Sequence, residues 1–204
     1  MGKRDTRQKI VEAAVAVFAR AGFSQATFQQ IADLCGLTQP AAFYYFRTKE
    51  ELIPAALDWI VVENHAYVSR AASPKDDART RLLKHFDGNL RWAVGKPEQA
   101  QLLLLMFYYA GFDSRYAARY GKMLDGGRAR IAEILHAGKR EGVFGFKEPV
   151  EQITEHLHDS LAGAFVSVLR TRSEKGTKAA EAELKRRHAR SKTLFKTLLA
   201  ARPT

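Results

Sequence analysis

The sequence predicts an all-α protein of about nine helices. Apolar residues recur at helical spacing through most of the 204 residues, and Pro and Gly interrupt these runs. After Leu52 no segment shows the sustained alternation of apolar and polar residues that a half-buried strand needs. We therefore expect an N-terminal three-helix domain at 1–50 and a larger helical domain at 51–204.

The first predicted helix begins at Asp5 or Thr6 and is terminated by Gly22. Phe23 is expected to pack back onto it. Its buried face comprises Ile10, Val11, Ala14, Val17, Phe18 and Ala21.

A helix-turn-helix is predicted next, between Thr27 and Lys49. Thr27 caps the first of its helices, and Gln30 completes a capping box. Gly36 follows where the chain needs a residue that tolerates a positive φ. Thr38 caps the second helix, which is about two turns long.

The following helix is predicted to open with Thr48 as its cap and Glu51 completing a second capping box. Lys49 lies in its first turn, where a positive charge opposes the helix dipole. A bound anion such as a DNA phosphate would offset that repulsion.

These positions together resemble the DNA-binding domain of the tetracycline-repressor (TetR) family. The resemblance covers about a quarter of the chain and is carried by Thr27, Ile31-Ala32, Gly36, Phe43-Tyr44-Tyr45-Phe46 and Lys49-Glu50-Glu51-Leu52. It implies double-stranded DNA and a small-molecule ligand as partners, and a homodimer.

By this resemblance, two sets of residues contact DNA. Those expected at base edges are Gln39, Pro40 and Ala41, and those expected at phosphates are Thr27, Thr38, Tyr44, Tyr45 and Lys49. Glutamine can pair with adenine through two hydrogen bonds, and Pro or Ala can contact a thymine methyl. Phe43 stands where the family usually has Tyr, so one phosphate-binding hydroxyl is absent.

From the helix capped by Thr48 onward, six helices are predicted from the apolar periodicity and from the positions of Pro and Gly. They span 48–71, 74–95, 97–110, 114–140, 149–171 and 177–200. Ser73 is the expected cap of the second of these, and Asp113 that of the fourth.

The middle of the chain is rich in large apolar residues, and the resemblance implies a ligand cavity there. The candidate lining residues are Trp92, Met106, Phe107, Tyr109, Phe112 and Phe165. A plain hydrophobic core is the alternative for each of them. Tyr108, Tyr109, His85 and His136 are the expected polar handles, so a hydrophobic or amphipathic ligand is predicted.

The last two predicted helices each carry a long apolar stripe. The resemblance implies that they form a dimeric four-helix bundle, with Leu157, Leu161, Phe165, Leu194 and Leu198 at the interface. The alternative is that both stripes belong to the core of one chain.

The composition and the spacing of particular residues exclude several kinds of site and of protein. The single cysteine, Cys35, excludes a disulfide within the chain and a Cys-based zinc site, and it fits a reducing cytoplasm. Leu102 to Phe112 is the longest apolar run, too short for the ~20 residues that span a bilayer. His156 and His158 point about 200° apart on a helix, which is wrong for chelation. We expect that the protein is not an enzyme and that it binds no metal, cofactor or membrane.

The net charge of +11 is concentrated away from the helix-turn-helix. Residues 1–50 hold seven Lys or Arg and four Asp or Glu, whereas 175–204 hold nine and two. A solvated helix face or a second contact to DNA or membrane would explain the C-terminal excess.

The sequence thus predicts a cytoplasmic transcriptional regulator, a repressor that a hydrophobic or amphipathic small molecule releases from a palindromic operator. The alternative is a dimeric structural DNA-binding protein without a ligand switch.

Overall fold

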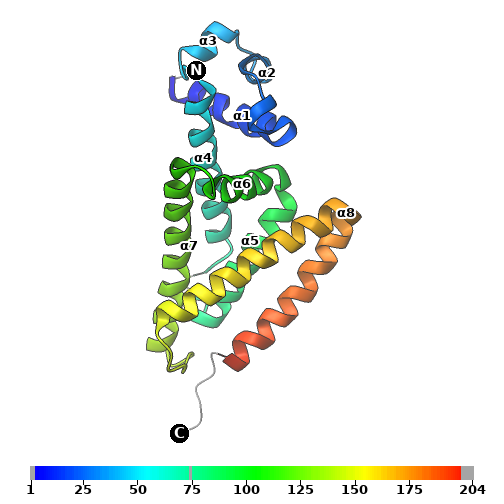
Figure 1. Cartoon of the computed structure of the whole chain (residues 1–204). Helices are drawn as coiled ribbons and strands as arrows, with labels where there is room; N and C mark the ends of the chain where they lie inside the picture. The colour runs from blue at the N-terminus through cyan, green and yellow to red at the C-terminus, as the bar shows by residue number, and fades with distance from the viewer. Residues whose placement is uncertain (1–2, 74, 199–204) are drawn as a thin grey trace.

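The computed structural model describes residues 3–73 and 75–198, with side chains for 5–73 and 75–197, and every regular element within them is a helix (Figure 1). These helices are α1 (Lys3–Gln25), α2 (Phe28–Leu34), α3 (Gln39–Phe43), α4 (Lys49–Ser69), α5 (Ala78–Gly95), α6 (Pro97–Ala110), α7 (Ser114–Arg140) and α8 (Val150–Leu198). The predicted all-α class is confirmed.

Two glycines interrupt helices without ending the helical assignment. Gly22 has φ 72°, as expected of the residue that terminates the first predicted helix. Gly176 has φ 80° and divides α8 into two arms, which form a V in Figure 1. The two arms of α8 correspond to the two helices predicted at 149–171 and 177–200.

The predicted helix at 74–95 begins too early. In the structure α5 starts at Ala78, because Asp77 rather than Ser73 is its cap: the Asp77 carboxylate accepts a hydrogen bond from the Thr80 N–H at 2.7 Å. The bounds of α6 and α7 and the Asp113 cap are confirmed.

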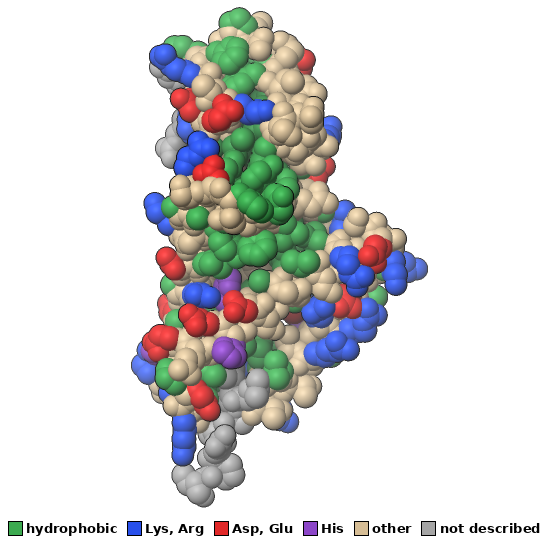
Figure 2. Space-filling view, in the orientation of Figure 1, with side chains coloured by type: hydrophobic (Ala, Val, Ile, Leu, Met, Phe, Trp, Pro, Cys, Tyr) green, Lys and Arg blue, Asp and Glu red, His purple; other side chains and the backbone are tan. Residues whose placement is uncertain are grey.

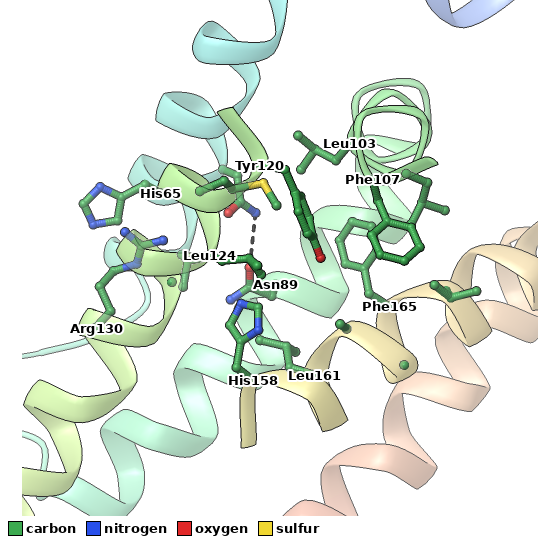
Figure 3. A pocket seen from close by; sticks show the side chains of 18 of the residues that line it. His65, Asn89, Leu103, Phe107, Tyr120, Leu124, Arg130, His158, Leu161 and Phe165 are labelled. Carbon is green, nitrogen blue, oxygen red and sulfur yellow. Dashed lines mark hydrogen bonds between the residues drawn. The ribbon is translucent and has the colours of Figure 1, made fainter. Parts of the chain in front are cut away.

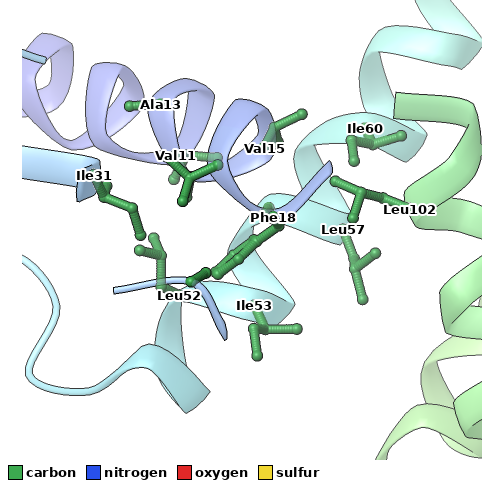
Figure 4. Packing of buried hydrophobic residues seen from close by; sticks show 14 of the residues in the cluster. Val11, Ala13, Val15, Phe18, Ile31, Leu52, Ile53, Leu57, Ile60 and Leu102 are labelled. Carbon is green, nitrogen blue, oxygen red and sulfur yellow. The ribbon is translucent and has the colours of Figure 1, made fainter. Parts of the chain in front are cut away.

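The first three helices and the start of α4 form a head at one end of the molecule (Figure 1). Phe18 is fully buried there, and the Phe23 ring packs edge-on against it at 5.2 Å between centroids, as predicted. Ile31 and Leu52 converge on the same core (Figure 4). Burying side chains of this size stabilises a fold by about 1.5–3 kcal/mol each.

This core continues from the head into the body of the molecule. Leu57 and Ile60 of α4 meet Leu102 of α6 in the same cluster (Figure 4). The predicted domain boundary at residue 50 therefore falls in the first turn of α4, within a continuous hydrophobic core. The division into two domains stays a prediction.

A second core joins α5, α7 and α8. It contains Phe86 and Phe195, whose rings meet edge-on at 5.0 Å, together with Ile131 and Leu135. In the described part of the chain, no helix combines the length and apolarity needed to cross a membrane.

Candidate functional site

The helix-turn-helix owes its shape to local hydrogen bonds. The Thr27 hydroxyl accepts from the Gln30 N–H at 3.2 Å, and the Gln30 side chain accepts from the Thr27 N–H at 3.0 Å, so the predicted capping box is present. Gly36 has φ 68°, which glycine adopts without strain. Thr38 caps α3 by accepting from the Ala41 N–H.

These caps fix where α3 begins, and α3 lies at the outer end of the head (Figure 1). Pro40 is exposed, while Gln39 and Ala41 are half-buried. The residues expected at base edges therefore lie together in the first turn of α3.

The aromatic residues after α3 divide between solvent and core. Tyr44 is 67% exposed and Tyr45 is half-buried, whereas Phe46 is buried. Phe43 stacks on Phe28 at 4.5 Å between ring centroids. Phe43 nevertheless stays 40% exposed, so it and the two tyrosines are within reach of a partner.

Lys49 has partners of its own within the chain. Its ammonium donates to the carbonyls of Ser24 and Ala26 at 3.0 and 3.2 Å. These carbonyls, without any bound anion, offset the charge in the first turn of α4. Its predicted phosphate contact would require these bonds to be shared or exchanged.

The second predicted capping box is only half formed. The Thr48 hydroxyl accepts from the Glu51 N–H, as expected. The Glu51 carboxylate, however, accepts from the Arg47 N–H at 2.9 Å rather than from that of Thr48.

A cavity of about 330 Å³ lies in the body, among α4, α5, α6, α7 and α8 (Figure 3). Its size is at the lower end of the range for small-molecule sites, about 300–1,000 Å³. Its lining includes the apolar side chains Val68, Leu103, Leu104, Phe107, Met123, Leu124, Leu161, Phe165 and Val166.

Two of the six predicted lining residues, Phe107 and Phe165, line this cavity. Trp92 and Met106 are instead fully buried in the first core, where Trp92 stacks on Phe165. Tyr109 packs against Phe23 of the head at 5.8 Å between ring centroids.

Phe112, the sixth, is 77% exposed. It belongs to an apolar surface at the end of α6, formed with the exposed Phe107 and Tyr108, and its ring lies 5.1 Å from that of Tyr108 between centroids. Figure 2 shows that hydrophobic side chains also gather below the head on the face in view. Of the expected polar handles, only His85 lines the cavity.

Most of the polar groups around the cavity were not predicted from the sequence. These are Asn64, His65, Asn89, Tyr120, Arg130 and His158. The Asn64 amide donates to the Asn89 side-chain oxygen at 3.3 Å (Figure 3), and the Asn89 amide donates to the His85 carbonyl at 2.9 Å. His158 lies next to Leu157 of the predicted apolar stripe, and this position hints that its side chain faces the interior. Nothing in the sequence around Arg130 indicates a cavity residue.

Arg130 brings a positive charge to the lining. Burial lowers the pKa of His85 to about 4, with nearby Arg130 adding to the effect. Burial and then the Arg128 charge lower the pKa of His158, and burial lowers that of the Arg130 guanidinium. Among the described residues that line the cavity, none is Asp or Glu.

The low pKa of His85 predicts acid sensitivity. In the unfolded chain His85 takes up a proton near its ordinary pKa of 6.5, but the folded protein resists protonation down to about pH 4. The folded state is therefore at no disadvantage above pH 6.5. As the pH falls from 6.5 toward 4, the free energy of unfolding decreases by roughly 3 kcal/mol. Urea unfolding at pH 7, 5.5 and 4 should show a steeper decline for the wild type than for His85→Asn. Parallel declines would contradict the assignment.

The predicted dimer residues lie in different environments. Leu157 and Leu161 are buried within the single chain, Phe165 is half-buried, and Leu194 is 43% exposed. The side chain of Leu198 lies outside the described residues. For Leu157 and Leu161, this placement matches the intramolecular alternative.

Within residues 3–73 and 75–198, no three His, Cys, Asp or Glu side chains gather closely enough to hold a metal ion.

Residues 10–56, which include α2, the turn and α3, match the family model described as bacterial regulatory proteins, tetR family. Residues 10–56 therefore form a TetR-family DNA-binding domain. One relative, the HTH-type transcriptional regulator TtgR of Pseudomonas putida, is 36% identical over 74 residues, which cover 36% of this chain and 35% of the relative. The probable acrEF/envCD operon repressor of Escherichia coli is 24% identical over 146 residues, covering 67% and 64%.

The matches to these two relatives span about a third and slightly under two thirds of their lengths. Solved TetR-like structures match over nearly the whole chain. A TetR transcription regulator from Haloarcula marismortui superposes with TM-score 0.77 at 23% identity, covering 93% of this chain and 97% of that one. A regulator from Saccharomonospora viridis in complex with choline gives 0.81 at 18% identity, covering 98% and 100%. At these identities the likeness concerns the fold.

Proposed function

We propose that this TetR-family protein is a homodimeric repressor that binds a palindromic operator through α3 and is released by a small molecule bound in the cavity. The observation that carries the proposal is that one helix, α4, connects the head, which holds α3, with the cavity. Its first half packs in the head through Leu52 and Ile53 (Figure 4), and its second half lines the cavity through Asn64 and Val68.

A second connection runs through α6. Leu103 and Phe107 line the cavity, while Tyr109 on the same helix packs against Phe23 of the head. A ligand that moves α4 or α6 would therefore reorient the head. In a dimer, such a change alters the separation of the two recognition helices, which must reach major grooves about 34–36 Å apart.

The switching energy follows from linkage. If the ligand binds the DNA-free conformation a hundredfold more tightly, saturation weakens operator binding by at most about 2.7 kcal/mol. That is sufficient to change occupancy of an operator.

The alternative, a structural DNA-binding protein without a switch, needs no cavity. The cavity among α4 to α8 therefore favours the ligand-responsive function. The choline in the S. viridis neighbour further supports a ligand role for this fold, although the lining here argues against a cation.

Replacing Gln39 tests the DNA-binding part of the proposal. A duplex is first selected from a random-sequence pool with the wild-type protein. Gln39→Ala should weaken binding to it by about 1–3 kcal/mol and relax the preference at one base pair, because a base-edge contact is lost. Fluorescence anisotropy on the selected duplex and its single-base variants measures both effects.

Gln101→Ala provides the matched control, since Gln101 is an exposed glutamine on α6, outside the helix-turn-helix. It should leave affinity and base preference unchanged. Selection of no preferred sequence would refute the proposed function, and an unchanged base preference in Gln39→Ala would remove Gln39 from the base-reading role.

A further inference from the structure

We propose that the cavity binds an amphipathic anion, a carboxylate carrying an alkyl or aryl tail, and that Arg130 holds its head group. The inference rests on the proposed function, because it names the class of ligand that would occupy the same cavity.

Arg130 has no acidic partner among the described residues, unlike Arg115, Arg119 and Arg128 of the same helix. Arg115 pairs with Asp113 at 2.7 Å, Arg119 pairs with Asp58, and Arg128 pairs with Glu155 at 3.3 Å. Arg130 forms no ion pair or hydrogen bond with any residue that the structure describes, although it is half-buried at the cavity. A partly desolvated guanidinium without a counter-charge is unfavourable, and a carboxylate that it binds through two hydrogen bonds would remove that cost.

Further donors surround the same end of the cavity. Figure 3 shows Arg130 beside His65, with Asn89 and His158 to the right of them. The His158 Nδ1 atom is buried without a hydrogen-bond partner, and the nearest carboxylate oxygen, on Asp159, is 3.9 Å away. A buried polar atom of this kind needs a partner, and an oxygen-rich head group could supply one directly or through water.

The opposite end of the cavity is apolar. Leu103, Phe107 and Phe165 gather there (Figure 3), contributed by α6 and α8. An alkyl or aryl tail placed there would leave the head near Arg130. Because none of the described lining residues is Asp or Glu, a cationic head would meet like charge with no counter-charge.

Three probes of equal chain length separate charge from hydrophobicity. The full-length protein is titrated at pH 8 by isothermal calorimetry with decanoate, with decanol and with decyltrimethylammonium. Decanoate should bind about tenfold or more tightly than decanol, because its head gains charge-assisted hydrogen bonds. The ammonium compound should bind more weakly than decanol.

Two substitutions on α7 then test Arg130 itself. Arg130→Gln should weaken decanoate binding by about ten- to a hundredfold while leaving decanol binding unchanged. The unchanged decanol affinity shows that the cavity is still folded. Arg140→Gln removes the same charge from an exposed position at the end of the same helix and should change neither affinity.

The inference is overturned if decanoate does not bind, if it binds no better than decanol, or if Arg130→Gln retains the wild-type affinity for it. None of these results affects selection of a DNA sequence. Failure of that selection would refute the proposed function instead, so the two can be told apart.

Discussion

Replacing Gly138 by alanine should lower the free energy of unfolding by about 2 kcal/mol or more, although alanine is the better helix former. Gly138 lies in the last turns of α7, where a Cβ atom would overlap the ring of Phe144 and stand 2.9 Å from the Ala78 Cβ. Phe144 is itself buried in the second core, so its ring has little room to retreat. Overpacking of this kind forces side chains off their rotamers or shifts the backbone.

Gly121→Ala is the matched control in the same helix. A Cβ atom at Gly121 meets no atom within 4 Å, so the substitution should raise the free energy of unfolding by about 0.5–1 kcal/mol. Urea denaturation followed by circular dichroism compares both variants with the wild type. Equal effects of the two substitutions would show that the helix end gives way around Phe144.

The head was predictable because its shape depends on local chemistry. Thr27 and Thr38 accept hydrogen bonds from N–H groups three residues ahead, and Gly36 takes a positive φ, so each signal lies within a few residues of its effect. Asp77 shows the limit of such local signals. Ser73 and Asp77 are both good caps, and only the structure decides between them.

The cavity was not predictable in the same way. Core residues and cavity residues are both large and apolar, so composition cannot separate Trp92 and Met106, which pack in the core, from Phe107 and Phe165, which line the cavity. Arg130 comes from α7, and only tertiary packing brings it to the same cavity as His158 of α8.

The apolar stripes of α8 contain both residues buried within the chain and residues exposed on its surface, and the sequence could not separate these two kinds either. A stripe is defined by spacing, which does not show whether the partner surface belongs to the same chain. Leu157 and Leu161 are buried in the second core of the single chain. Val166 and Leu194, one on each arm, are the large apolar side chains of α8 that the described part of the chain leaves exposed.

The double variant Val166→Glu, Leu194→Glu should therefore convert the proposed dimer into a folded monomer. Val166 is 49% exposed and Leu194 is 43% exposed in the single chain, so glutamate can reach water there without disturbing the core. In a two-fold dimer each substitution occurs twice, and like charges brought together cost several kcal/mol. A penalty of about 4 kcal/mol would raise the dimer dissociation constant roughly a thousandfold.

Sedimentation velocity at micromolar concentration gives the oligomeric state, and circular dichroism shows whether the variant folds. Val62→Glu is the control, because Val62 is 63% exposed on α4 and lies outside the proposed interface. It should remain dimeric. The monomeric double variant should also bind the selected duplex far more weakly, since one protomer reaches only one half-site. A wild type that sediments as a monomer would refute the proposed dimer, and a double variant that stays dimeric would exclude these exposed faces of α8 from the interface.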